Sequence, residues 1–168
     1  IVEVGAVALA DRKRTDLHFH SYLNPQRSID EEAEKVHGLS IERLSNEPEF
    51  SEIAEEFLEF VEGSILVIHN AAFDLGFLNA ELKRASSNYP ALEEICEVED
   101  TLLMARSKFP GQRNSLDALA NRFEISGYDR SFHGALLDAN ILADVYIHLT
   151  GGQSKFEFIA SNINSNFE

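Results

Sequence analysis

Asp138 lies where an ionised side chain is costly unless it binds something. It sits inside the apolar stripe of a predicted helix, with Ile141, Leu142 and Val145 following at three, four and seven residues. An unpaired carboxylate on such a face costs on the order of several kcal/mol, so it must be protonated, paired with a base or bound to a cation. The alternative is an aspartate at the edge of the stripe that reaches water.

Asp74 raises the same question at another predicted helix. It follows the short apolar strand 65–68 by about six residues and opens the helix that comes next. Ligand sites in open α/β sheets lie beside the carboxyl ends of strands. The helix dipole alone also favours an aspartate in a first turn, and both interpretations stay open. Asp100 and Asp117 lie in opening turns too, and for them we favour the structural interpretation.

His133 precedes Asp138 by five residues, with Gly134 between them. A loop histidine beside carboxylates is a candidate general base, because its pKa near neutrality lets it accept a proton from water; a surface histidine is the alternative. No spacing of cysteines and histidines indicates zinc, and no phosphate loop or nucleophile elbow occurs. Carboxylate oxygens suit Mg²⁺ or Mn²⁺, and paired ions held by aspartates are the usual solution for attacking a phosphodiester.

Charge and composition limit the partners. The chain has 168 residues, and 14 Lys and Arg against 29 Asp and Glu give a net charge of 14 − 29 = −15. Bulk attraction to a polyanion is excluded, so any nucleic acid must be bound locally. The single Cys96 fits a reducing compartment, and no apolar run approaches the roughly 18 residues of a membrane helix. We therefore expect a cytoplasmic protein without a membrane partner.

The elements that must position these residues follow from hydrophobic periodicity. Turn residues separate two strands at the start, and later a strand precedes a helix twice. The predicted strands are 1–10, 17–23, 65–68 and 95–98, with 65–68 buried on both faces, and the main helices are 48–63, 72–85, 101–107, 114–123 and 135–149. This order predicts an α/β domain over residues 1–150, with a mixed sheet flanked by helices. Gly151-Gly152 should end the last helix, leaving 151–168 as a flexible tail.

Two segments carry a family resemblance. His69-Asn70-Ala71-Ala72-Phe73-Asp74-Leu75-Gly76-Phe77 and His133-Gly134-Ala135-Leu136-Leu137-Asp138-Ala139 resemble the second and third motifs of the DEDD-type 3′→5′ exonucleases, in the branch with a catalytic histidine. The similarity is greatest to the proofreading subunits of bacterial replicative DNA polymerases and runs to about residue 158. It implies a ribonuclease H-like fold and removal of nucleotides from the 3′ end of single-stranded DNA.

The resemblance also implies roles for individual residues. Asp138 would bind and Asp74 would support two catalytic ions, Mg²⁺ or Mn²⁺, while His133 would activate the attacking water. Three further residues match positions that contact the terminal nucleotide or could assist there: Glu32, His37 and Asn70. Replacing Asp138 should therefore abolish most of the activity.

The first family motif, an Asp-x-Glu pair on the first strand, has no counterpart in the sequence. Glu3 is the only acidic residue of the opening strand, and its alternation with Val2 and Val4 predicts an outward-facing side chain. The family places its first strand shortly before the segment that begins at Ile1. We therefore expect a domain truncated at its start, whose activity as an isolated chain is in doubt.

Partners follow from the resemblance as well. A polymerase catalytic subunit would deliver the DNA, its tether replacing a basic surface. Gln153, Phe156 and Phe158 are similar to a glutamine-led motif that binds the sliding clamp. Two other functions stay open: a catalytically silent structural subunit associated with the polymerase, and an exonuclease that trims RNA 3′ ends.

Overall fold

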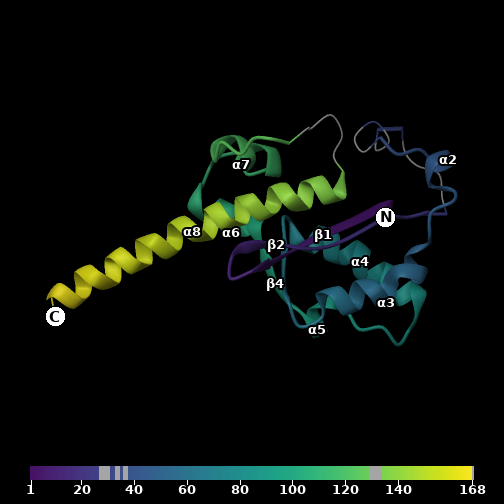
Figure 1. Cartoon of the computed structure of the whole chain (residues 1–168), viewed down its shortest axis with the longest axis horizontal. Coiled ribbons are helices and arrows are strands. Elements are labelled where there is room, and N and C mark those ends of the chain that lie inside the picture. Colours follow the sequence, from purple (N-terminus) through teal and green to yellow (C-terminus); the bar gives the residue numbers. More distant parts are fainter. Residues whose placement is uncertain (27–30, 33–34, 36–37, 129–133, 168) are drawn as a thin grey trace.

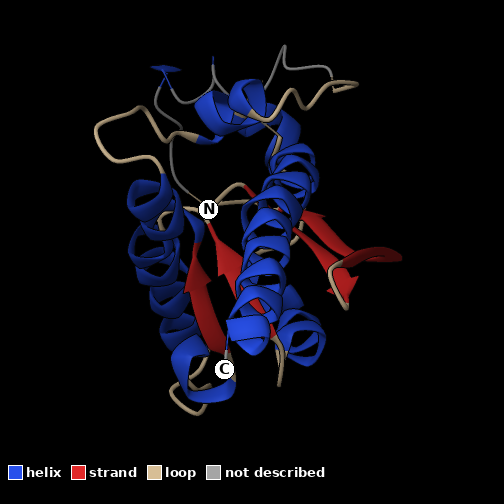
Figure 2. Ribbon diagram, turned by 90° about the vertical axis from the view of Figure 1, so that its left-hand side faces the viewer, coloured by secondary structure: helices blue, strands red, loops and turns tan. Residues whose placement is uncertain are grey.

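Four strands form two separate two-stranded sheets in the described part of the chain. The structure is a computed structural model that describes residues 1–26, 31–32, 35, 38–128 and 134–167, the last 16 of these by their backbone alone. β1 (Glu3–Ala10) pairs antiparallel with β2 (Lys13–Tyr22), and β3 (Ile65–Ile68) pairs parallel with β4 (Glu97–Asp100) (Figure 2). The predicted mixture of strand directions in an α/β fold is confirmed. The two pairs do not form one continuous sheet, because no described strand connects β1 or β2 to β3 or β4.

The β1–β2 connection is tighter than the sequence predicted. Asp11 and Arg12 have φ values of 52° and 63°, as the two central residues of a type I′ hairpin turn require. β2 therefore begins at Lys13, and the predicted polar turn over 11–16 was too long. The register places His20 opposite Gly5 and His18 opposite Val7, and the two histidines share one face of the hairpin because they are two residues apart on β2.

The first long helix matches its predicted stripe. α2 (Ile41–Leu44) is a single turn capped by Ser40, whose Oγ accepts the Arg43 N–H at 3.1 Å. α3 (Phe50–Val61) follows it, and its buried residues are Phe50, Ile53, Ala54, Phe57 and Val61. The periodicity between Pro48 and Gly63 is therefore confirmed as a core-facing helix.

The two strand–helix units also form, with one shift. β3 leads into α4 (Ala71–Ala85), and β4 leads into α6 (Thr101–Lys108), which α7 (Leu116–Arg122) follows. The predicted strand 95–98 begins later, at Glu97, because Leu92–Ile95 forms the short helix α5. The start of α5 is held by the Glu94 carboxylate, which accepts the Ala91 N–H at 3.2 Å.

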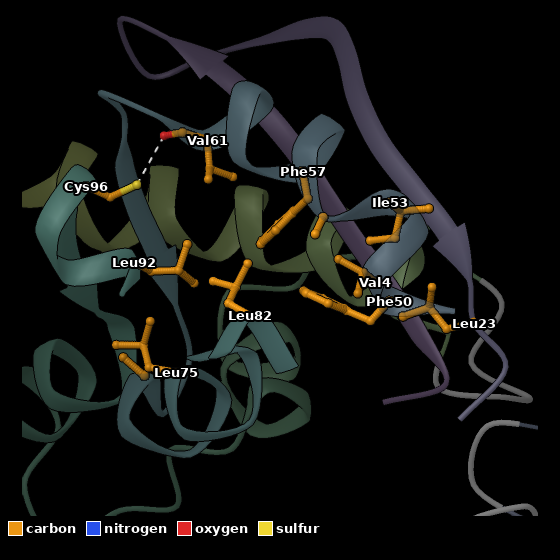
Figure 3. Packing of buried hydrophobic residues seen from close by; sticks show 12 residues of the cluster. Val4, Leu23, Phe50, Ile53, Phe57, Val61, Leu75, Leu82, Leu92 and Cys96 are labelled. Atoms are coloured by element: carbon orange, nitrogen blue, oxygen red, sulfur yellow. Dashed lines mark hydrogen bonds between the residues drawn. The ribbon is translucent and has the colours of Figure 1, made fainter. Parts of the chain in front are cut away.

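Two hydrophobic clusters make up the core. The larger one joins β1, α3, α4 and α5, and in Figure 3 Val4, Phe50 and Leu82 point into it. At its edge the Cys96 thiol donates to the Val61 carbonyl oxygen at 3.2 Å. β3 is less buried than predicted: Ile65 is 51% exposed, because in the described chain this strand has a neighbour along one edge only.

The last helix is longer than predicted. α8 (Ala135–Phe167) lies along β1 and continues beyond Gly151-Gly152, so that its C-terminal half projects from the rest of the protein (Figure 1). Glycine in a helix costs roughly 1 kcal/mol relative to alanine but does not block its hydrogen bonds, which is why the pair does not end α8. The flexibility of residues 151–168 stays a prediction. Within the described residues, no helix combines the length and apolar character needed to cross a bilayer.

Candidate active site

Asp138 occupies the first turn of α8. Its N–H donates to the Gly134 carbonyl oxygen at 2.9 Å, and its side chain is partly buried. The apolar stripe around it packs against α6 and α7 through Leu137, Ile141, Val145 and Leu149, whereas Leu142, which the sequence placed in the same stripe, is not part of this cluster. Asp138 therefore lies at the start of a helix that is firmly anchored further along its length.

Asp74 occupies the first turn of α4 and is also partly buried. Burial raises the pKa of this carboxyl group, and the negative charge of Asp100 raises the pKa further. Both effects disfavour the ionised form, and a bound cation would offset both. The environment of Asp74 is therefore compatible with metal binding.

Asp100 connects the two helices that begin on this side of the molecule. Its Oδ1 accepts the Leu102 N–H at 2.8 Å and so caps α6, which confirms the structural interpretation. Oδ1 also accepts the Asn70 N–H at 3.1 Å, and Oδ2 accepts the Ala71 N–H at 3.0 Å. A single carboxylate thus fixes the start of α4 as well, three residues before Asp74.

Asn70 precedes α4 in a left-handed conformation, with φ 67° and ψ 61°. Asparagine tolerates this region better than most residues. Its backbone N–H is bound by Asp100 while the residue is exposed. The proposed contact between Asn70 and a nucleotide is compatible with this exposure and stays a prediction.

His69 makes structural hydrogen bonds. Burial lowers its pKa, which favours the neutral ring. Nε2 lies 2.7 Å from the Asn114 carbonyl oxygen and must carry the proton, because that oxygen can only accept. Nδ1 then accepts from the Thr101 hydroxyl at 2.9 Å. His69 therefore joins the end of β3 to α6 and to the loop before α7.

Glu3 does not face outward, and that prediction is wrong. Its side chain is 8% exposed, with Oε2 2.6 Å from His20 Nε2 and Oε1 accepting the Ala135 N–H at 2.9 Å. Alternation in a strand tells which residues share a face but not which face is covered, and here α8 covers the face that carries Glu3. The available signal was Gly5, whose missing side chain lets the helix approach.

The remaining predicted residues are only partly visible. Glu32 is exposed, whereas His37 and His133 lie outside the described residues, as do the side chains of Gln153, Phe156 and Phe158. Within the described residues, no group of three or more His, Cys, Asp or Glu side chains could hold a metal ion. Asp74 and Asp138 alone are therefore at most part of a ligand set.

Comparisons with known proteins agree with this fold and these motifs. The exonuclease family model RNase_T matches residues 1–146, and the chain belongs to this family. It is 49% identical over 158 residues to the DNA polymerase III subunit epsilon of Escherichia coli strain K12, covering 94% of this chain and 65% of that protein. It is also 49% identical over 160 residues to the subunit of the same name from Rickettsia typhi, covering 95% of this chain and 70% of that protein. The chain thus spans about two-thirds of the length of these relatives.

A solved structure shares the fold. Exonuclease X in complex with 5′ overhanging duplex DNA superposes with a TM-score of 0.71, covering 92% of this chain and 84% of that chain at 23% sequence identity. The predicted exonuclease fold is confirmed. The family implies dependence on a divalent metal. Asp74 and Asp138 are both partly buried, and a bound cation would offset the effects that raise the pKa of Asp74.

Proposed function

We propose that the complete protein is a 3′→5′ DNA exonuclease that proofreads for a bacterial replicative polymerase. The observation that carries this proposal is the 49% identity to DNA polymerase III epsilon subunits across the segment that contains both Asp74 and Asp138. The solved exonuclease of the same fold was captured with DNA, which supports DNA as the substrate here. The net charge of −15 fits an enzyme that receives only a short single strand from a tethered polymerase subunit.

Asp138 and Asp74 would hold two Mg²⁺ or Mn²⁺ ions. When bound, such ions lower the pKa of water and neutralise charge that develops on the phosphate. His133 accepts the proton of the attacking water as general base. Glu32, His37 and Asn70 bind and orient the terminal nucleotide. The start of α4, fixed by Asp100, would give Asn70 and Asp74 a common rigid support.

The test uses 3′-labelled single strands and the complete protein. With Mg²⁺ or Mn²⁺ we expect release of terminal nucleotides, no release in chelator, and a loss of at least about 100-fold in Asp138→Ala. Asp117→Asn is the matched control, because Asp117 also lies in the first turn of a helix, α7, but has no assigned role. Unchanged turnover in Asp138→Ala would remove the central assignment. An inactive wild type would favour a silent polymerase-associated subunit, and faster cleavage of RNA than of DNA would favour the RNA-trimming function.

His133 has a separate test. Activity should rise with pH through a histidine-like pKa, and His133→Gln should slow hydrolysis by about 10²–10⁴-fold with little change in substrate binding. The pH–rate profile of the variant is the decisive measurement. A profile identical to that of the wild type would assign the rise to water on the metal instead.

Binding to the sliding clamp would involve the C-terminal half of α8. Phe156 and Phe158 would supply two aromatic side chains to an apolar pocket of the clamp, and a short peptide of this kind would act mainly through avidity. Phe156→Ala with Phe158→Ala should weaken clamp binding by at least about tenfold without altering cleavage of free single strands. Equal binding by both forms would discard the motif.

A further inference from the structure

The start of α8 is held by a carboxylate that comes from the other end of the chain. Glu3 Oε1 accepts the N–H of Ala135, the first residue of α8, at 2.9 Å. We propose that Glu3 is a positioning residue for hydrolysis: it fixes the N-terminus of α8 and thereby the place of Asp138. The inference rests on the proposed nuclease function, and nothing in it requires Glu3 to touch metal or substrate.

The backbone packing at this point is direct. A Cβ atom on Gly5 would lie 2.5 Å from the Leu136 nitrogen and 2.7 Å from the Ala135 carbonyl carbon, closer than such atoms approach. The first turn of α8 therefore rests on the backbone of β1, and only glycine fits there. Glu3 is two residues away on the same face of β1, which places its carboxylate at the first free N–H of the helix.

His20 holds the carboxylate of Glu3 from the other side. Its Nε2 lies 2.6 Å from Glu3 Oε2, and its ring packs edge-on against Tyr22 with centroids 4.8 Å apart. The Arg43 guanidinium in turn lies 4.9 Å from the centre of the Tyr22 ring. Glu3 is thus buried with both oxygens bound, which fixes its orientation as a loose surface cap would not.

A short rigid path joins Glu3 to Asp138. The Asp138 N–H donates to the Gly134 carbonyl oxygen and so closes the first turn of α8. Ala135, whose N–H Glu3 accepts, is the first residue of that turn. Loss of the Ala135 contact leaves that N–H without its acceptor and lets the first turn shift. Misplacement of a catalytic group by about 1 Å can lower the rate by about 100-fold. Glu3 should therefore act on turnover and metal dependence more than on substrate affinity.

Two substitutions at Glu3 in the complete protein separate positioning from direct ligation. Glu3→Ala should lower kcat at least tenfold and raise the Mg²⁺ concentration for half-maximal activity, with KM for DNA within about threefold of wild type. Glu3→Gln should stay within about threefold of wild type, because its amide oxygen still accepts the Ala135 N–H. Glu52→Ala is the control: the Glu52 carboxylate accepts the Glu49 N–H at 2.8 Å at the start of α3, which carries none of the proposed metal ligands. A decrease in kcat for Glu3→Gln as large as that for Glu3→Ala would overturn the proposal. Such a result would mean that the negative charge of Glu3, and not its acceptor oxygen for the Ala135 N–H, supports activity.

Backbone amide exchange tests the same contact without activity. Residues 135–138 should lose protection at least about tenfold in Glu3→Ala while Leu116–Arg122 of α7 is unchanged. His20→Ala should show a smaller loss in the same residues, and His18→Ala none, because His18 lies on the same face but its ring nitrogen lies 3.4 Å from the Asp16 carbonyl oxygen and not beside Glu3. Unchanged protection in Glu3→Ala would overturn the proposal. A wild-type protein without metal-dependent hydrolysis would contradict the proposed nuclease function. The amide-exchange data would still show whether Glu3 holds the start of α8.

Discussion

The two helices that carry Asp74 and Asp138 begin in similar ways, but in the part of the chain that the structure describes their starts differ in how many N–H groups one carboxylate binds. At α4, Asp100 takes the N–H groups of Asn70 and Ala71 through both of its oxygens, and it caps α6 at the same time. At α8, a single oxygen of Glu3 takes a single N–H. Both candidate ligands therefore lie in helices whose starts are bound by an acidic side chain from a strand, and among the described residues Asp100 binds more of these N–H groups than Glu3 does.

The difference predicts which substitution destabilises the whole fold. Asp100→Ala removes the acceptor of N–H groups in two helices and should lower the free energy of unfolding by about 2–4 kcal/mol, measured by urea denaturation. Glu94→Ala is the matched control, because the Glu94 carboxylate accepts the Ala91 N–H at the start of one short helix, α5. A loss for Asp100→Ala no larger than that of the control would show that the shared carboxylate does not stabilise both helices.

Replacement of glycine by alanine should have opposite effects on stability at the β1–α8 contact and within α4. Gly5→Ala forces a Cβ into the backbone of α8 and should destabilise the protein by about 1–3 kcal/mol. Gly76→Ala in the middle of α4 meets no atom within 4 Å and should stabilise it by about 0.5–1 kcal/mol. Thermal unfolding of both variants measures the pair. Equal effects would mean that β1 and α8 do not touch at Gly5.

The stability that His69 contributes at the end of β3 should also depend on pH. The native pKa of His69 is lowered by burial, so the stability from its neutral ring is present above its ordinary pKa of 6.5 and is lost as the pH falls through the lowered value. His69→Gln should cost about 1–2 kcal/mol at pH 7.5 through lost hydrogen bonds, and the gap to wild type should narrow towards pH 5. Unfolding curves at several pH values measure this gap. A gap that stays constant would contradict a buried neutral histidine.

The smallest effect concerns Asp74 without metal. Because the pKa of Asp74 is raised in the native state, this carboxyl group ionises at a lower pH in the unfolded chain than in the folded protein. The ionised group therefore destabilises the folded protein above the raised pKa, and this destabilisation is absent below the ordinary pKa of 3.8. Asp74→Asn should therefore stabilise the metal-free protein at pH 7 by no more than about 0.5 kcal/mol, after allowance for solvent screening of a half-exposed group. The gain should vanish near pH 3. Melting in chelator tests it, and a gain that persists at pH 3 would rule out the charge as its cause.

Residues near each other in sequence were the ones that could be placed in advance. Asp100 caps N–H groups two and three residues later, and the stripe of α3 repeats within one helix, so both could be read from spacing. Glu3 binds a backbone group 132 residues away, and no local pattern specifies which face of β1 would be covered. The motifs around Asp74 and Asp138 identify the exonuclease family from the sequence, because each motif is a contiguous segment of the chain.

The central claim is that the starts of α4 and α8 supply carboxylates to one metal site. Titration of Mn²⁺ into the complete metal-free protein, followed by electron paramagnetic resonance, tests it most directly. We predict that Asp74→Asn and Asp138→Asn each weaken Mn²⁺ binding at least about tenfold, that the double variant loses less than the product of the two because both act on one site, and that Asp117→Asn binds like wild type. Wild-type Mn²⁺ binding in the double variant would contradict the account.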